Sequence, residues 1–177
     1  MRQRAFVTVL LAVLCALAGA GEYQSNKNRF SLKYDTDWKA TTSPDVTVEI
    51  ALVPNSDACS STAFLSAGAL YDQQLSGLTT DDVVSHTTGE AVTRQVKNMG
   101  FVSEFKLLHE GQSKLGDVNA YEVLMRYTTP EGARYRATFV TFNKGFFYNV
   151  SFTSTPSSFK SDFEVAKKVL KTFKFTR

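Results

Sequence analysis

One stretch near the C-terminus most constrains how this chain can fold. Large apolar residues occupy every second position there, with small polar residues between them: Phe146, Tyr148, Val150 and Phe152. This period of two indicates a β-strand with one face on a core and the other toward water. Because a single strand cannot bury such a face alone, the run requires a sheet with a second layer packed on it.

The second layer follows at once in the sequence. Pro156 ends the strand, and apolar residues then recur at spacings of four, three, four and three: Phe159, Phe163, Ala166, Leu170 and Phe173. These spacings predict an amphipathic helix whose apolar stripe lies on the sheet.

The upstream chain predicts more strands and one more helix. Strands are expected at 30–34, 46–53, 63–70, 105–112, 121–127 and 135–140. Thr129-Pro130-Glu131-Gly132 favours a type I turn, and Asn143-Lys144-Gly145 favours a three-residue hairpin with Gly145 in the left-handed region. Helical spacing from Thr80 to Met99, with acids in the first turn and Gly100 after it, predicts a helix.

Composition is that of one ordinary globular domain, with 43% hydrophobic and 21% charged residues. We therefore expect an α+β fold, a mainly antiparallel sheet sandwiched by helices. The expected core residues are Tyr121, Val123, Met125, Phe139, Tyr148, Val150, Phe152, Phe163 and Leu170.

The N-terminus has the pattern of a secretory signal peptide. Arg2 and Arg4 precede a short uncharged apolar run that ends in Ala18-Gly19-Ala20. We expect a signal at 1–20, a flexible arm at 21–28 and a single domain at 29–177, in a protein exported to the periplasm or secreted. Losing the signal lowers the formal charge from +3 to +1, which does not favour nucleic acid as a partner. No later stretch is long enough for a transmembrane segment.

Candidate chemistry is sparse. His86 and Glu90 have metal-ligand spacing on the predicted helix, but two ligands alone do not make a site. Nothing in the sequence places a histidine beside Cys59, the one cysteine left after signal removal, as a nucleophile would need. We therefore expect no catalytic residue, no metal and no cofactor.

Several segments resemble the PsbP-like superfamily. They are the opening Phe30-Ser-Leu-Lys-Tyr34 with Trp38, then Gly116-Asp-Val-Asn-Ala-Tyr121, the strands at 135–140 and 147–152, and the closing Val-Leu-Lys-Thr-Phe-Lys-Phe175. The resemblance covers about 30–175 and implies an α/β/α sandwich. The superfamily includes photosystem II extrinsic proteins, Mog proteins that bind Ran, and exported proteins of the DcrB kind. The proline usual before the family's tryptophan is missing here, and no shared catalytic set transfers.

The resemblance implies an exported, non-enzymatic binding or accessory protein of the assembly type that acts on a protein partner. The alternative is a small-ligand or lipid carrier with an apolar cavity between sheet and helix. The predicted partner-binding residues are Lys167, Lys171 and Lys174 on the last helix, with Phe147 on the neighbouring strand. Phe147 is expected on the strand face opposite Tyr148 and Phe152, where it is an exposed aromatic if helices cover one face of the sheet and a core residue if they cover both. The plainer interpretation of the lysines is a solvated helix face.

Overall fold

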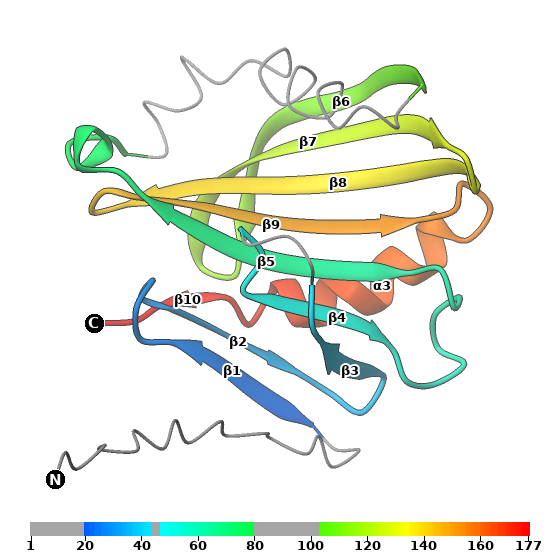
Figure 1. Ribbon diagram of the computed structural model, residues 1–177, viewed down its shortest axis with the longest axis horizontal. Coiled ribbons are helices and arrows are strands. Elements are labelled where there is room, and N and C mark those ends of the chain that lie inside the picture. The colour runs from blue at the N-terminus through cyan, green and yellow to red at the C-terminus, as the bar shows by residue number, and fades with distance from the viewer. Residues whose placement is uncertain (1–19, 44–46, 80–102) are drawn as a thin grey trace, which may run out of the picture.

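The computed structural model describes residues 20–43, 47–79 and 103–177, which form two antiparallel sheets and the helix α3 (Phe159–Leu170) (Figure 1). The large sheet has the order β3-β4-β5-β9-β8-β7-β6 and the small sheet β1-β2-β10. The strands of the large sheet are Trp38–Thr41 (β3), Ile50–Pro54 (β4), Phe64–Tyr71 (β5), Ser103–Leu115 (β6), Val118–Thr129 (β7), Gly132–Asn143 (β8) and Phe146–Ser154 (β9). Those of the small sheet are Gly21–Ser25 (β1), Phe30–Tyr34 (β2) and Lys174–Phe175 (β10). The expected mainly antiparallel α+β fold is confirmed.

Strands β6 to β9 form an antiparallel meander that makes up more than half of the large sheet. These strands are longer than the sequence pattern predicts. The β8–β9 loop differs from the expected three-residue hairpin. It has two residues, Lys144 at φ 50° and Gly145 at φ 83°. Two central residues at positive φ give the turn whose twist matches that of the flanking strands. Lys144 is thus held at the tip of a tight hairpin.

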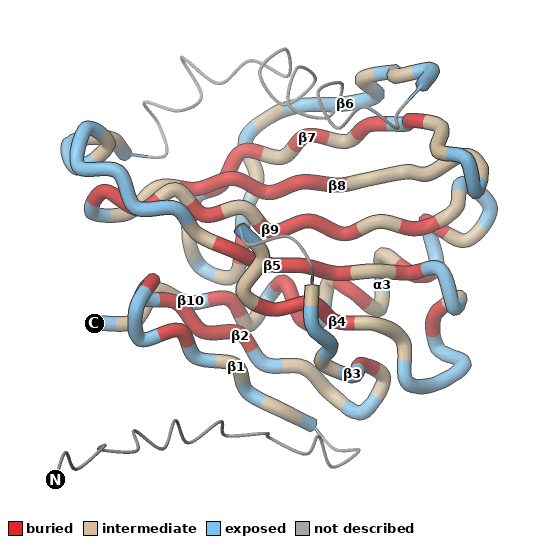
Figure 2. The backbone as a smooth tube through the Cα atoms, in the orientation of Figure 1, coloured by how far each residue is buried: buried red, intermediate tan, exposed pale blue. Residues whose placement is uncertain are grey.

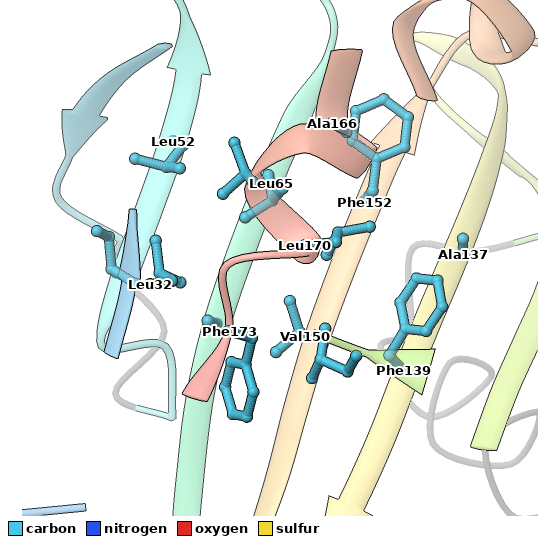
Figure 3. Close-up of a cluster of buried hydrophobic side chains, with 14 of the residues drawn as sticks. Leu32, Leu52, Leu65, Ala137, Phe139, Val150, Phe152, Ala166, Leu170 and Phe173 are labelled. Atoms are coloured by element: carbon cyan, nitrogen blue, oxygen red, sulfur yellow. The ribbon is translucent and has the colours of Figure 1, made fainter. Parts of the chain in front are cut away.

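Helix α3 covers one face of the large sheet, as its apolar spacing predicts. Ala166 and Leu170 point at Leu65, Val150 and Phe152 from the strands beneath (Figure 3). Phe173, just after the helix, is also buried and stacks on Phe30 with ring centroids 5.6 Å apart.

Phe163 is less buried than expected. It lies at the margin of the helix–sheet interface, where its ring stacks on Phe159 and Phe152 while one side stays partly open. The helical stripe is therefore correctly placed, but its most buried members are Phe159, Ala166, Val169 and Leu170.

The other face of the large sheet carries a second buried cluster: Tyr121, Val123, Met125, Tyr127 and Val140. This corrects the expectation of one core. Tyr121 pairs with Val140 rather than with Phe139, and directly opposed residues share a face. Tyr121, Val123 and Met125 therefore lie on the face opposite to Phe139 and α3.

Residues 21–25, expected to be part of a flexible arm, form β1. This strand pairs with β2 along its whole length, and β10 pairs with the other side of β2. Tyr23 packs on Phe30 and its hydroxyl donates a hydrogen bond to Glu49 over 3.1 Å. The sequence Gly-Glu-Tyr-Gln-Ser has one large apolar residue, so its alternation is too weak to indicate a strand.

Three further expectations differ from the structure or lie outside the residues that it describes. The predicted strand 46–53 begins at Ile50, because Thr47 crosses over β5 and its carbonyl lies against Gly68. The helix predicted from Thr80 to Met99 and the signal at residues 1–19 lie outside the described residues. Within residues 20–43, 47–79 and 103–177, no helix is long and apolar enough to span a bilayer.

Candidate partner-binding surfaces

The predicted lysine stripe lies on the outer side of α3 and on β10. The ammonium of Lys167 lies 2.7 Å from a carboxylate oxygen of Glu164 and 5.0 Å from the centroid of the Phe163 ring. This hydrogen bond from Lys167 lowers the pKa of Glu164 below its ordinary value. Lys171 and Lys174 are exposed. Part of the positive charge of the stripe is therefore neutralised on the helix itself.

Phe147 does not belong to that stripe. Strand alternation turns it to the face opposite α3, where it is half-buried. Its ring meets Phe142 edge to face at 5.1 Å, and it lies directly opposite Leu70 on β5. The structure therefore separates the four predicted site residues into two places on opposite sides of the large sheet.

Cys59 is buried beside the start of α3 and is not arranged as a nucleophile. Burial, with a smaller contribution from Asp162, raises the pKa of the Cys59 thiol to about 11. A thiol with a raised pKa carries little of the reactive thiolate at neutral pH. His109 lies on β6, away from this site, and His86 lies outside the described residues.

Asp162 is a buried carboxylate whose hydrogen bonds join α3 to neighbouring segments of the fold. It accepts hydrogen bonds from the Ser60 amide at 3.0 Å, from the Ser60 hydroxyl at 2.8 Å and from the Ser154 hydroxyl. These donors satisfy the charge of a side chain that is 2% exposed. Asp162 thus fastens the 55–62 loop and the end of β9 to the helix. In the part of the chain that the structure describes, no three His, Cys, Asp or Glu side chains gather as a metal site would require.

Exposed apolar side chains gather at the end of the molecule where β5 ends and β8 turns into β9. Leu70 and Tyr71 are 60% and 55% exposed, the largest values among the big hydrophobic residues described. Figure 2 shows this end of β5 and the following turn η1 (Gln73–Leu75) as exposed. The amide of Asp72 donates to the carbonyl of Gly145, which holds the end of β5 against the hairpin tip. We call this region the hairpin-end surface; it comprises Leu70, Tyr71, Phe142, Lys144 and Phe147.

An open groove of about 400 Å³ adjoins the hairpin-end surface. Four chain segments line it: the loop 76–79, the start of β7, the β8–β9 hairpin and β10. The lining residues are Ser76, Gly77, Leu78, Thr79, Val118, Asn119, Phe142, Asn143, Lys144 and Phe175. Its lining is therefore mixed, with four apolar side chains, two amides and one cation.

Two lysines reach the groove. Lys144 lines it, and Lys114 donates a hydrogen bond to Asn119 on its wall. The Arg29 guanidinium lies 5.7 Å from the Phe146 ring centroid. The backbone carbonyl of Arg29 accepts a hydrogen bond from the Thr176 amide.

The sequence gives little signal for this groove because its walls come from segments that are far apart in the chain. The local signal for an exposed apolar surface here is Leu70-Tyr71 followed by Asp72. Two consecutive large apolar residues at a strand end cannot both face one core.

Solved structures similar to this chain share its fold at low sequence identity. The solution structure of cyanobacterial PsbP (CyanoP) from Synechocystis is 15% identical, has a TM-score of 0.65, and covers 91% of this chain and 95% of its own. The structure of LpqN, involved in cell envelope biogenesis of Mycobacterium tuberculosis, is 13% identical with a TM-score of 0.60, over 89% of this chain and 92% of its own. A Bacteroides thetaiotaomicron structure is 14% identical with a TM-score of 0.60, over 91% of this chain and 50% of its own. Identities this low show a shared fold and do not transfer a function.

No curated protein sequence matches the chain. The PsbP family model matches residues 18–175, which is nearly the whole chain and includes every strand and α3. The resemblance inferred from the opening motif, the meander and the closing helix is thereby confirmed, and the chain belongs to the PsbP family.

Proposed function

We propose that this protein is an exported, non-enzymatic accessory protein that binds a protein partner through its surface. The observation that carries the proposal is the hairpin-end surface, where Leu70 and Tyr71 remain more than half exposed. Large exposed apolar side chains beside cations are typical of binding hot spots. PsbP family membership supports the accessory role, and the involvement of LpqN in cell envelope biogenesis is compatible with it.

A small-ligand carrier is the second candidate. Its apolar cavity was expected between sheet and helix, but that space is filled by closely packed rings. Phe152 lies 5.6 Å from both Phe159 and Phe163, measured between ring centroids. The carrier is favoured only by the groove of about 400 Å³, whose size falls within the range of small-molecule pockets. Because the groove is open and its lining is mixed, it suits a segment of a larger partner better than a small molecule.

We also propose that a helix covers the second sheet face. Val123 and Met125 are fully buried there, and the described side chains packed on this cluster come from the sheet itself: Phe105, Leu107, Phe142 and Phe147. The segment 80–102, which carries the predicted helical spacing, is the proposed cover. Val92→Asp, which places a charge on the apolar stripe, should destabilise the fold in urea melts, whereas Thr93→Asp should not. Equal stability of the two variants would contradict this layer.

Export and partner binding can be tested in the same host. Tagged protein should be recovered outside the cytoplasm with an N-terminus near Gly21, as determined by sequencing. Chemical crosslinking before lysis, followed by mass spectrometry, should recover a specific protein. Native mass spectrometry that instead finds a co-purifying small molecule would favour the carrier. A cytoplasmic location or the absence of any crosslinked partner would contradict the accessory function.

A further inference from the structure

We propose that the groove at the hairpin end binds an extended acidic polypeptide segment of the partner. This inference rests on the proposed accessory function and adds the chemistry of the bound element. The groove has three properties that such a segment would use: a free cation, free amide groups and an apolar floor.

The free cation is Lys144. Among the residues that the structure describes, its ammonium makes no ion pair or hydrogen bond, although it lines the groove. By contrast, Lys167 and Lys168 on α3 lie within 4 Å of the carboxylates of Glu164 and Asp37. A cation without a partner, placed on a groove wall, favours a carboxylate arriving from outside.

A second lysine reaches the groove wall. Lys114 donates a hydrogen bond to the side chain of Asn119, which lines the groove. Two acids are nearby in the chain. Asp72 already accepts a hydrogen bond from the Gln74 amide at 2.9 Å, and Asp117 is exposed in the β6–β7 turn. The two lysines on the groove wall, Lys114 and Lys144, favour an acidic segment over a basic one and should speed its encounter with the groove.

The free amides favour a polypeptide over a lipid headgroup. In the described part of the chain, the side chain of Asn143 has no hydrogen-bond partner, and Asn119 uses its side-chain oxygen to accept from Lys114. A carboxamide has both a donor and an acceptor, which is what a peptide backbone offers in return. An isolated headgroup with acceptor oxygens would use only the donors.

The apolar floor fixes where one side chain of the segment would lie. Leu78, Val118, Phe142 and Phe175 line the groove. Phe142 also continues into an apolar row across the sheet, because it lies opposite Phe147, which lies opposite Leu70. In an extended segment the side chains at i and i+2 are about 7 Å apart on one face. An apolar anchor and a carboxylate two residues away therefore match the floor and Lys144.

Binding of a synthetic peptide tests this geometry directly. The probe is a nonapeptide of alternating glutamate and glycine with one central leucine, titrated into 15N-labelled full-length protein and followed by NMR. We expect amide shifts concentrated in segments 76–79, 118–119, 142–145 and 175. A matched peptide with lysine in place of glutamate should bind at least about tenfold more weakly. Shifts centred on α3, or equal binding of the two peptides, would overturn the proposal.

Two single substitutions separate charge from apolar contact, and a third serves as the control. Lys144→Gln removes the free cation and should weaken the acidic peptide about three- to tenfold, whereas Lys39→Gln, which removes the same charge on β3, should change its Kd less than about twofold. Val118→Thr keeps the shape of the groove but makes its floor polar, and it should also weaken the peptide. Circular dichroism and the 15N spectrum check that each variant is folded. Equal effects of Lys144→Gln and Lys39→Gln would reduce the interaction to net charge and overturn the site.

Other outcomes have separate meanings. Binding to vesicles of phosphatidylglycerol and phosphatidylcholine that depends on Lys144, without peptide binding, would replace the polypeptide by an anionic lipid. If Lys144→Gln and Val118→Thr together leave the crosslinked partner from host cells unchanged, the groove assignment fails while the accessory function stands. If the wild-type protein captures no partner, the proposed function itself fails.

Discussion

The outer side of α3 and the hairpin-end surface both present cations and aromatic rings, yet they differ in what those groups already contact. On α3, Lys167 is engaged with Glu164 and covers the Phe163 ring, and Lys168 lies 3.9 Å from Asp37. At the hairpin end, Lys144 has no partner among the described residues and Leu70 is 60% exposed. Charges that are paired within the chain serve the fold, whereas unpaired ones remain available to another molecule. We therefore expect substitutions beneath α3 to reduce stability and substitutions at the hairpin end to reduce binding.

The largest expected effect is in the core beneath α3. Leu170 is 5% exposed and packs between the helix and the sheet (Figure 3). Leu170→Ala should lower the free energy of unfolding by about 2–5 kcal/mol, because it removes buried methyl groups and leaves a cavity. Urea denaturation followed by circular dichroism measures this. The matched exposed variant Leu70→Ala should cost less than about 1 kcal/mol. Similar losses for both would erase the contrast between the two regions.

The next effect concerns the fastening of α3 to its neighbouring loop. Asp162→Ala leaves the Ser60 amide and the hydroxyls of Ser60 and Ser154 without their acceptor. We expect a loss of about 1–3 kcal/mol in denaturant melts, since buried donors are left unsatisfied. Glu164→Ala, which removes an exposed carboxylate on the same helix, is the control and should have little effect. An Asp162→Ala protein as stable as wild type would contradict the structural role of this carboxylate.

The lysine stripe predicted from sequence should matter less than the hairpin end. Reversing Lys167, Lys171 and Lys174 to glutamate should leave the fold intact and weaken partner capture by less than about threefold, through long-range charge alone. That residual effect should vanish as salt rises. Crosslinked partner can be quantified by mass spectrometry at two ionic strengths. A loss that equals or exceeds that of the hairpin-end variants would return the partner contact to α3.

The smallest effect is on stability at alkaline pH. The pKa of Cys59 is raised from 9.0 to about 11, chiefly by burial. The buried thiol is favoured in its neutral form, so its contribution to stability is present below pH 9 and declines as pH rises through the window from 9 to 11. Cys59→Ala should therefore show a shallower loss of stability across this window than wild type. Parallel pH curves for the two proteins would contradict the burial of this thiol.

Most of the fold could be predicted from the sequence because its signals are local. The alternation from Phe146 to Phe152 and the spacing from Phe159 to Leu170 are each set by one element's own geometry. The second apolar face could not be separated from the first, because the face of Tyr121 depends on its register with Val140. Strand β1 was missed for a similar reason, since pairing with β2 rather than its own pattern holds it in place.

The candidate site was less predictable than the fold. Lys167 was predicted from the charge stripe of the last helix and Phe147 from its place on the other face of the neighbouring strand, and the large sheet lies between them. Lys144 and Phe175 line one groove, although Lys144 lies in a hairpin turn of the large sheet and Phe175 on a strand of the small sheet. Such a site is created by tertiary packing, and no sequence spacing encodes it.

The most direct test compares partner capture in the native host for two variants of the full-length protein. One carries Leu70→Ser with Lys144→Gln at the hairpin end, and the other carries the three lysine reversals on α3 and β10. We expect the hairpin-end variant to lose at least about tenfold of the crosslinked partner while its urea midpoint stays close to wild type. Full capture by that variant, with loss in the lysine variant, would contradict the assignment of partner binding to the hairpin-end surface.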